Sequence, residues 1–453
     1  MSHPTPYVED TIVASATAPG VAGVAVVRIS GPAVEHIAEQ ILGKLPVPRY
    51  AQLGVFAASD GAVLDHGLAL YFPRPGSFTG ESVLELHGHG GPVVVAALID
   101  AVVALGARHA EAGEFSKRAF LNGKLDLVQA EAIADLIGSG TEQAARAAAR
   151  SMAGVFTKKI GEVEAQLMSL RLHVEAAIDF PEEEIDFLSD RKLAERIEDC
   201  DAAFVAIRKA TSIGRVLRDG YQLVIVGEPN VGKSSLLNLL SGQDAAIVTE
   251  IAGTTRDILR EQIKLDGLSV ELIDTAGLRN NPDQIEAEGI RRAKAALQTA
   301  DAALWIQDAT KQDDGAVAAN GLDEHIHAGI PVVVVVNKID LVDSGAVTAE
   351  DGDIFVSAKT GAGLDSLIAR IKTLAGYENL GEGAFTARQR HLDALDRAQQ
   401  HFRRGRQALD DAKSGEIFAE ELRLAQQDLG EITGIMTSDD LLGKIFSEFC
   451  IGK

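Results

Sequence analysis

The feature that most constrains the fold of this chain is a glycine-rich loop between an apolar run and a helical pattern. Residues 227–235 read GEPNVGKSS, after LVIV and before LLNLL. In this GxxxxGK[ST] pattern, backbone N–H groups surround a phosphate, Lys233 reaches the β and γ oxygens, and the Ser234 hydroxyl can hold Mg²⁺. A glycine turn without a ligand is the plain alternative. The strand pattern before the loop and the helix pattern after it favour phosphate binding.

Three further motifs follow in the order that a guanine-nucleotide switch requires, each after a β-like run. Residues 274–277 (DTAG) place an acid beside the metal and an N–H near the γ-phosphate. Residues 337–340 (NKID) offer the Asp340 carboxylate to two guanine N–H donors, a pair that adenine lacks. Residues 357–359 (SAK) present backbone amides to guanine O6. Singly these motifs are weak, but together they resemble the translation-factor class of P-loop GTPases.

The segment GTTRD at 253–257 lies between the phosphate loop and DTAG. We assign Thr255 to the Mg²⁺ shell of the GTP state, a contact released after hydrolysis, which makes this loop a switch. Arg256 fits a surface ion pair better than an arginine finger. Leu278 occupies the position where small signalling GTPases carry a water-orienting glutamine, so another group must take that role.

The residues suggest a cation and a carboxylate for catalysis. Asn230, the carbonyls of Thr249 and Ile251, and an oxygen of Thr254 would form a hard oxygen cage for K⁺, whose charge replaces that of an arginine finger. Asn230 fits equally well as a turn residue bonded to its own backbone. Acids between 283 and 288 are candidates for orienting the water, although a solvated helix start explains each of them as well.

The length of the chain predicts several domains, because 453 residues are more than one hydrophobic core ordinarily contains. Alternating β-like and helical patterns up to about residue 125 predict a small α/β domain. Runs rich in Ala, Glu, Arg and Leu predict helices beyond it, and continuous Val, Ile and Leu runs predict a mostly parallel sheet. We therefore expect an α/β domain, a discontinuous helical domain and a Ras-like sheet domain inserted into it, with the segments 1–125, 126–215, 216–380 and 381–453.

Composition excludes several classes of protein. The formal charge of −23 disfavours non-specific adhesion to nucleic acid or anionic membrane. Cys200 and Cys450 are far apart, which excludes a disulfide framework and fits a reducing compartment. No signal peptide or membrane span is recognisable, so we expect a cytoplasmic protein. His87 and His89 have metal-like spacing but no third ligand.

The ends of the chain carry a closer resemblance. The segments DTIVASATAPG, VAVVRISG, SFTGESVLELHGHGGP, GEFSKRAFLNGKLDLVQAEAIADLI and VEAAIDFPEEEI, with the closing FCIGK, resemble the bacterial tRNA-modification GTPase family MnmE, also called TrmE. The resemblance runs from about residue 10 to residue 453. The resemblance agrees with the domain organisation predicted from the pattern of residue types along the chain.

The resemblance implies a function beyond GTP hydrolysis. With the flavoprotein MnmG (GidA), in a heterotetramer or larger complex, such a protein adds a carboxymethylaminomethyl or aminomethyl group at C5 of wobble uridine 34 in certain tRNAs. The one-carbon donor is 5,10-methylenetetrahydrofolate or 5-formyltetrahydrofolate. The folate residues fall on Arg28, Glu85, Lys124 and Lys453, where cations meet the glutamate tail and Glu85 accepts from the pterin. Cys450 has either a role in modification or that of a small apolar residue.

The resemblance also implies the ligands of the GTPase site. Hydrolysis is stimulated by K⁺ and by pairing of two GTPase domains within a homodimer held by the N-terminal domains. The K⁺ site falls on Asn230, Thr249, Ile251 and Thr254, the Mg²⁺ site on Ser234 and Thr255, and the water-orienting carboxylate on Glu286. The expected GTP contacts are Asn230, Val231, Gly232, Lys233, Ser234, Ser235, Thr249, Glu250, Ile251, Ala252, Gly253, Thr254, Thr255, Asp274, Thr275, Ala276, Gly277, Asn337, Lys338, Asp340, Ser357, Ala358 and Lys359.

Two alternative functions use the same switch. A ribosome-assembly GTPase would carry a basic RNA-binding domain, whereas the nearest basic run here, RRGR at 403–406, fits a helix face. A signalling switch that needs an external activator would hydrolyse GTP slowly whatever the salt cation.

Overall fold

The computed structural model of the chain separates into two compact units, each described here by itself. The first unit comprises 1–137, 151–204 and 393–453, and the second comprises 138–150 and 205–392. The structure describes residues 10–179, 191–242, 260–274, 300–311, 330–342, 352–377, 383–435, 439–447 and 449–452.

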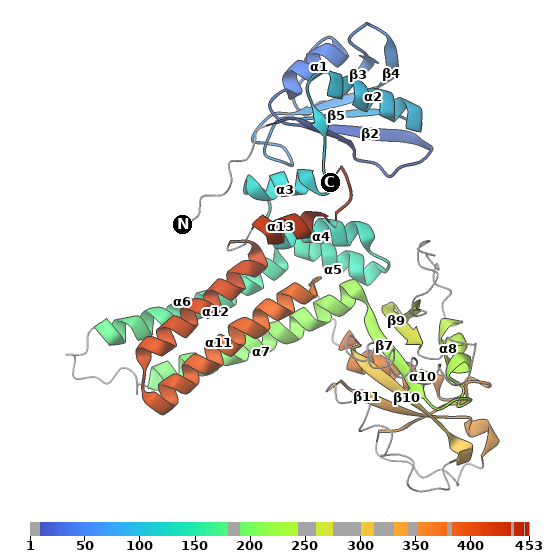
Figure 1. Cartoon of the computed structure of the whole chain (residues 1–453), viewed down its shortest axis with the longest axis vertical. Helices are drawn as coiled ribbons and strands as arrows, with labels where there is room; N and C mark the ends of the chain where they lie inside the picture. The colour runs from blue at the N-terminus through green and yellow to red at the C-terminus, as the bar shows by residue number, and fades with distance from the viewer. Residues whose placement is uncertain are drawn as a thin grey trace, which may run out of the picture. The chain divides into compact units, whose positions relative to one another are not determined.

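The first unit begins with a six-stranded sheet of order β3-β4-β5-β2-β1-β6. Neighbouring strands are antiparallel except β1 and β6, which are parallel. Helices α1 and α2 lie along the sheet in Figure 1 and share its hydrophobic core. The elements are β1 (Ile12–Ser15), β2 (Ala22–Ser30), α1 (Val34–Leu42), β3 (Gln52–Ala57), β4 (Val63–Phe72), β5 (Val83–Gly90), α2 (Pro92–Ala104), β6 (Arg108–His109) and α3 (Glu114–Leu121).

Alternation along β2 and β5 gives this sheet two different faces. Val27 and Ile29 are buried in the core that includes α1 and α2. Arg28 lies between them in sequence, so its side chain projects from the opposite face. The strand register sets Arg28 opposite Glu85. A charged pair therefore occupies the face away from the main core.

A buried ion network holds α3 against the start of this unit. Arg118 is 1% exposed, and its guanidinium donates to Asp10 at 2.6 Å, to Glu114 at 2.9 Å and to Glu81 at 3.1 Å. Arg108 donates to Glu114 at 2.6 Å and to Asp10 at 2.6 Å. Because charges removed from water need partners, these contacts are required for α3 to pack here.

Helices make up the rest of the first unit. Helix α6 packs along α12, and α13 contacts α3. Phe402 on α11 lies between Phe204 and Phe418, with ring centroids 5.6 and 6.5 Å away. None of the described helices is long and apolar enough to cross a membrane. The helices are α4 (Leu127–Gly138), α5 (Glu142–Met152), α6 (Val155–Asp179), α7 (Arg191–Asp219), α11 (Gln389–Ala412), α12 (Gly415–Thr433) and α13 (Asp439–Ser447), of which α4, α5, α7 and α11 run partly into the second unit.

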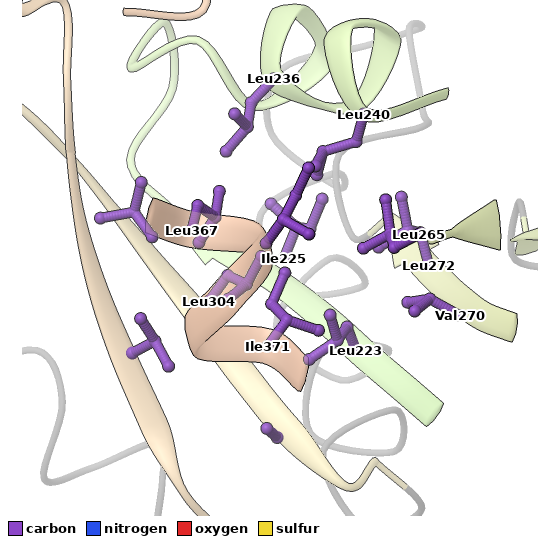
Figure 2. Close-up of a cluster of buried hydrophobic side chains, with 14 of the residues drawn as sticks. Leu223, Ile225, Leu236, Leu240, Leu265, Val270, Leu272, Leu304, Leu367 and Ile371 are labelled. Atoms are coloured by element: carbon purple, nitrogen blue, oxygen red, sulfur yellow. The ribbon is translucent and has the colours of Figure 1, made fainter. Parts of the chain in front are cut away.

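The second unit contains a six-stranded sheet of order β12-β11-β10-β7-β9-β8. All pairs are parallel except β8 and β9. Leucine, isoleucine and valine side chains from β7, β9, β10, α8 and α10 meet in the core drawn in Figure 2. The elements are β7 (Tyr221–Gly227), α8 (Lys233–Ser241), β8 (Arg260–Leu265), β9 (Leu268–Asp274), β10 (Ala302–Asp308), η1 (Ala309–Lys311), β11 (Val332–Asn337), η2 (Ile339–Leu341), β12 (Ile354–Phe355) and α10 (Leu364–Leu374).

The chain enters and leaves the sheet of this unit at neighbouring points. Gly214 on α7 lies so close to the segment after the sheet that a Cβ built on it would stand 2.7 Å from the carbonyl oxygen of Phe385. Adjacent ends are what insertion of one domain into another requires. The expected fold class, α/β and helical parts with a mostly parallel sheet, is confirmed.

Candidate functional site

The glycine-rich loop joins β7 to α8 at the carboxyl end of the parallel sheet. Gly232 has φ +100°, and helix α8 begins at the next residue, Lys233. The Lys233 ammonium donates to the carbonyls of Gly227 and Glu228, both at 2.7 Å. The Ser234 side chain is exposed in the first turn of α8. The first turn of a helix, a lysine and a hydroxyl thus gather where a phosphate and its metal are bound in such loops.

Asn337 connects three segments of this edge. Its side chain is 1% exposed, donates to the Val231 carbonyl at 2.8 Å and accepts from the Ala358 N–H at 2.9 Å. A Cβ on Gly232 would lie 2.2 Å from the Asn337 amide nitrogen, so only glycine fits there. The buried amide therefore fixes the glycine-rich loop and the SAK segment in one arrangement.

Two further residues of the motifs, Asp340 and Lys359, are charged and lie at the surface. Asp340 is exposed, and one oxygen accepts from the buried Ser357 hydroxyl at 2.7 Å. That bond orients the carboxylate, and each of its two oxygens can still accept a hydrogen bond from a ligand. Lys359, two residues after Ser357, is exposed. The structure thus brings Asn337, Asp340 and Ser357 together as the motifs predict.

Asp308, at the end of β10, belongs to the same edge and was missed from the sequence. It accepts from the Lys338 ammonium at 2.6 Å and from the Thr310 hydroxyl at 2.8 Å. Burial alone raises the pKa of Asp308, but the hydrogen bonds from Lys338 and Thr310 outweigh it and lower this pKa below the ordinary value. One signal in the sequence could have identified it: Asp308 is an acid at the carboxyl end of an apolar strand. That strand, β10, lies between β7 and β11, whose ends carry two of the motifs.

Asn230 has a backbone role in the loop. It adopts φ +66°, and its carbonyl accepts from the Lys338 ammonium at 2.8 Å. The other K⁺ and switch positions at 249–255, residues 275–277 and Glu286 lie outside the described residues, as does Lys453. Asp274 closes β9, and the structure describes its backbone only.

Two of the four predicted folate residues, Arg28 and Glu85, contact each other on the N-terminal sheet. The Arg28 Nε donates to Glu85 Oε1 at 2.9 Å, and the guanidinium lies 5.7 and 5.8 Å from the ring centroids of Phe78 and Phe115. An Nη1 contact at 3.4 Å reaches the carbonyl of Gly452. Arg28 and Glu85 each retain about a fifth of their side-chain exposure. They form a partly open, charged face beside the exposed ring of Phe78, whereas Phe115 is fully buried.

The segment around Cys450 is anchored to this domain. Ile451 forms an antiparallel bridge with Ala112, and the Gly113 N–H donates to the Cys450 carbonyl at 3.3 Å. The Cys450 thiol is free and exposed, whereas burial raises the pKa of Cys200 to about 11. The buried Cys200 thiol therefore stays protonated at neutral pH.

Lys124 and the two histidines of the N-terminal domain each have a different partner. Lys124 is exposed and donates to the Pro75 carbonyl at 3.0 Å. His87 contacts Glu85 at 3.2 Å and His89 contacts Asp65 at 2.7 Å, so the two histidines face different carboxylates. Throughout the described ranges, no group of three or more His, Cys, Asp or Glu is placed to hold a metal ion.

The parallel sheet, the glycine-rich loop at its carboxyl edge and the Asn337–Asp340 segment define a P-loop nucleotide-binding domain with the guanine-specificity motif. Family models agree: "GTP-binding protein TrmE N-terminus" matches residues 11–124, and "MnmE helical domain" matches residues 127–450. The chain belongs to the MnmE (TrmE) family.

Relatives share this organisation over their whole length. The tRNA modification GTPase MnmE of Hydrogenovibrio crunogenus is 53% identical over 450 residues, which cover 98% of this chain and 99% of that protein. The protein of the same name from Coxiella burnetii is 53% identical over 448 residues, with coverage of 98% and 99%. Among solved structures, Aquifex aeolicus Era bound to GDP.AlF4- is 28% identical over 40% of this chain and 66% of that chain, with a TM-score of 0.27.

Proposed function

We propose that this chain is a GTP-hydrolysing enzyme that acts in tRNA modification. Family membership supports the role in tRNA modification, and the site supports the nucleotide. The observation that carries the nucleotide assignment is the buried Asn337 amide, which joins the phosphate-binding loop to the guanine-reading segment. Guanine is favoured over adenine because an oriented Asp340 carboxylate accepts from N1–H and N2–H of guanine.

The donors of the site suit two cations of different size. The Ser234 hydroxyl, with Thr255, would hold Mg²⁺, a hard ion that prefers oxygen ligands. Asn230, with oxygens from Thr249, Ile251 and Thr254, would hold K⁺. A cation there supplies positive charge for the transition state. We assign the orientation of the attacking water to Glu286.

The charged face around Arg28 is the proposed site for a tetrahydrofolate one-carbon donor. Glu85 accepts from a pterin amine, Arg28 and Lys124 pair with carboxylates of the glutamate tail, and Lys453 completes the set. Phe78, which is 36% exposed, supplies a flat apolar wall for a ring system, and the buried Phe115 supports Arg28 from within the domain. Cys450 lies in the segment whose Gly452 carbonyl contacts Arg28, which supports a place near the donor.

The finer reaction follows from the family. We propose that the chain acts as a homodimer held by its N-terminal domains, with MnmG in a heterotetramer or larger complex. Together they would build the carboxymethylaminomethyl or aminomethyl group at C5 of wobble uridine 34, in the cytoplasm. We propose that three domains share these roles, with boundaries at residues 1–125, 126–215, 216–380 and 381–453.

Two measurements test the proposal. GTP turnover by the purified chain should rise by at least tenfold in KCl over NaCl at equal ionic strength, and equal rates would remove the K⁺ site. Wobble nucleosides of tRNA from cells lacking the gene should lose the modification and regain it with the wild-type chain but not with Lys233→Ala. Fully modified tRNA together with immature ribosomal subunits would instead indicate a ribosome-assembly GTPase.

A further inference from the structure

Asp308 is an almost fully buried carboxylate at the nucleotide edge of the sheet. Its side chain is 5% exposed. One oxygen accepts from the N–H of Thr310 at 3.0 Å and from its hydroxyl at 2.8 Å, and the other accepts from the Lys338 ammonium at 2.6 Å. Bonds on both oxygens fix the orientation of the carboxylate. The Lys338 side chain is therefore held by a rigid anion.

Lys338 and its neighbour Asn337 bind two consecutive carbonyls of the glycine-rich loop. The Lys338 ammonium donates to the Asn230 carbonyl at 2.8 Å, and the Asn337 amide donates to the Val231 carbonyl at 2.8 Å. Asn230 adopts φ +66°, a left-handed backbone conformation that is uncommon outside glycine and that the surroundings of the residue must support. The bond from Lys338 supplies such support.

These two bonds also decide where the loop amides point. In a planar trans peptide, the C=O of one residue and the N–H of the next point in opposite directions. Drawing the carbonyls of Asn230 and Val231 toward β11 turns the N–H groups of Val231 and Gly232 away from it. N–H groups that share one direction form the cradle that an anion needs.

We propose that Asp308 is a positioning residue for guanine-nucleotide binding, which holds Lys338 on the Asn230 carbonyl and so keeps the loop amides aimed at the phosphates. This inference rests on the proposed GTP binding. It adds a residue that contacts no nucleotide, on a strand that carries none of the four motifs. Asp308 acts through Lys338, so its contribution must depend on that lysine.

A double-mutant cycle tests this dependence. Asp308→Asn keeps the shape and removes the charge, and hydrogen bonds to charged groups contribute enough to change affinity by on the order of tenfold. We expect Asp308→Asn and Lys338→Ala each to speed dissociation of a fluorescent GDP from the full chain by about that factor. The dissociation rate of the double variant should then be within twofold of that of the faster-dissociating single variant, because both changes remove the same interaction.

The control is Asp266→Asn, which removes an ion pair with Lys372 at 3.2 Å in a turn of the same unit. It should leave GDP dissociation unchanged, and all variants should keep the wild-type circular dichroism spectrum. An unchanged rate for Asp308→Asn, or effects of the two single changes that multiply in the double variant, would overturn the inference. A wild-type chain that binds no guanine nucleotide would instead contradict the proposed function.

Discussion

The buried ion network of the N-terminal domain allows one prediction to be worked out in detail, for the change Glu114→Gln. The Glu114 carboxylate accepts from Arg108 at 2.6 and 2.8 Å, from Arg118 at 2.9 Å and from the Glu111 N–H at 2.8 Å. Burial alone raises the pKa of Glu114, but these donors outweigh it and lower the pKa from 4.5 to about 2. Glutamine keeps the shape of the side chain and removes its charge.

The pKa change sets the magnitude and the pH range. Each unit of difference between the unfolded and folded pKa of a group corresponds to about 1.4 kcal/mol of stability. The ionised Glu114 therefore contributes about 3 kcal/mol to the stability of its surroundings. Because the folded pKa is the lower one, this stabilisation is present at neutral pH, declines as the pH falls below 4.5, and is lost near pH 2. Glu114→Gln should therefore destabilise the domain at pH 7 and much less at about pH 3.

Hydrogen exchange read by mass spectrometry is suited to a chain of several domains, since it localises the effect. At pH 7, peptides that cover 108–121 should exchange on the order of a hundredfold faster in Glu114→Gln, as about 3 kcal/mol requires. Peptides from the sheet of the second unit should not change. Glu111→Gln is the matched control, because its side chain is exposed in the same segment. Equal exchange in Glu114→Gln and wild type at pH 7, or an equal acceleration at about pH 3, would refute the reasoning.

Two further predictions concern the proposed ligands. Gly232→Ala should lower GTP affinity by about a hundredfold or more in a binding titration. The new methyl group would lie 2.2 Å from the Asn337 amide nitrogen and would displace that nitrogen from the Val231 carbonyl. Wild-type affinity in this variant would show that the loop relaxes freely. Arg28→Gln should weaken 5-formyltetrahydrofolate binding about tenfold or more in calorimetry while sparing GTP, because it removes the cation held by Glu85; unchanged folate affinity would remove the proposed pocket.

Much of the second unit could be predicted from the sequence because its strands are buried on both faces. Such strands appear as continuous apolar runs, as in VVVVV before Asn337, and the motifs follow at the ends where parallel strands deliver their side chains to one edge. An apolar strand and the motif that follows it are adjacent in the chain, so a single sequence is enough to recognise both.

The contacts that escaped prediction depend on distant pairing. Asp308 looks like any acid after a strand until Lys338, 30 residues later, is placed against it. Arg28 alone resembles a surface charge, since its pairing with Glu85 depends on the register of two strands that alternation does not specify. Arg118 is a cation within a helical pattern, and its burial is known only when three carboxylates are placed around it.

The Arg28–Gly452 contact joins residues 424 positions apart, and it has a consequence for how the protein is made. A ribosome adds about 5–20 residues per second, so Arg28 waits on the order of half a minute for its last neighbours to emerge. Until the last residues emerge, the charged face around Arg28 is open on that side, whereas residues 205–392 of the second unit are synthesised earlier. Nascent chains stalled before residue 449 should therefore fold a competent GTP site, while the proposed folate site lacks its last contacts.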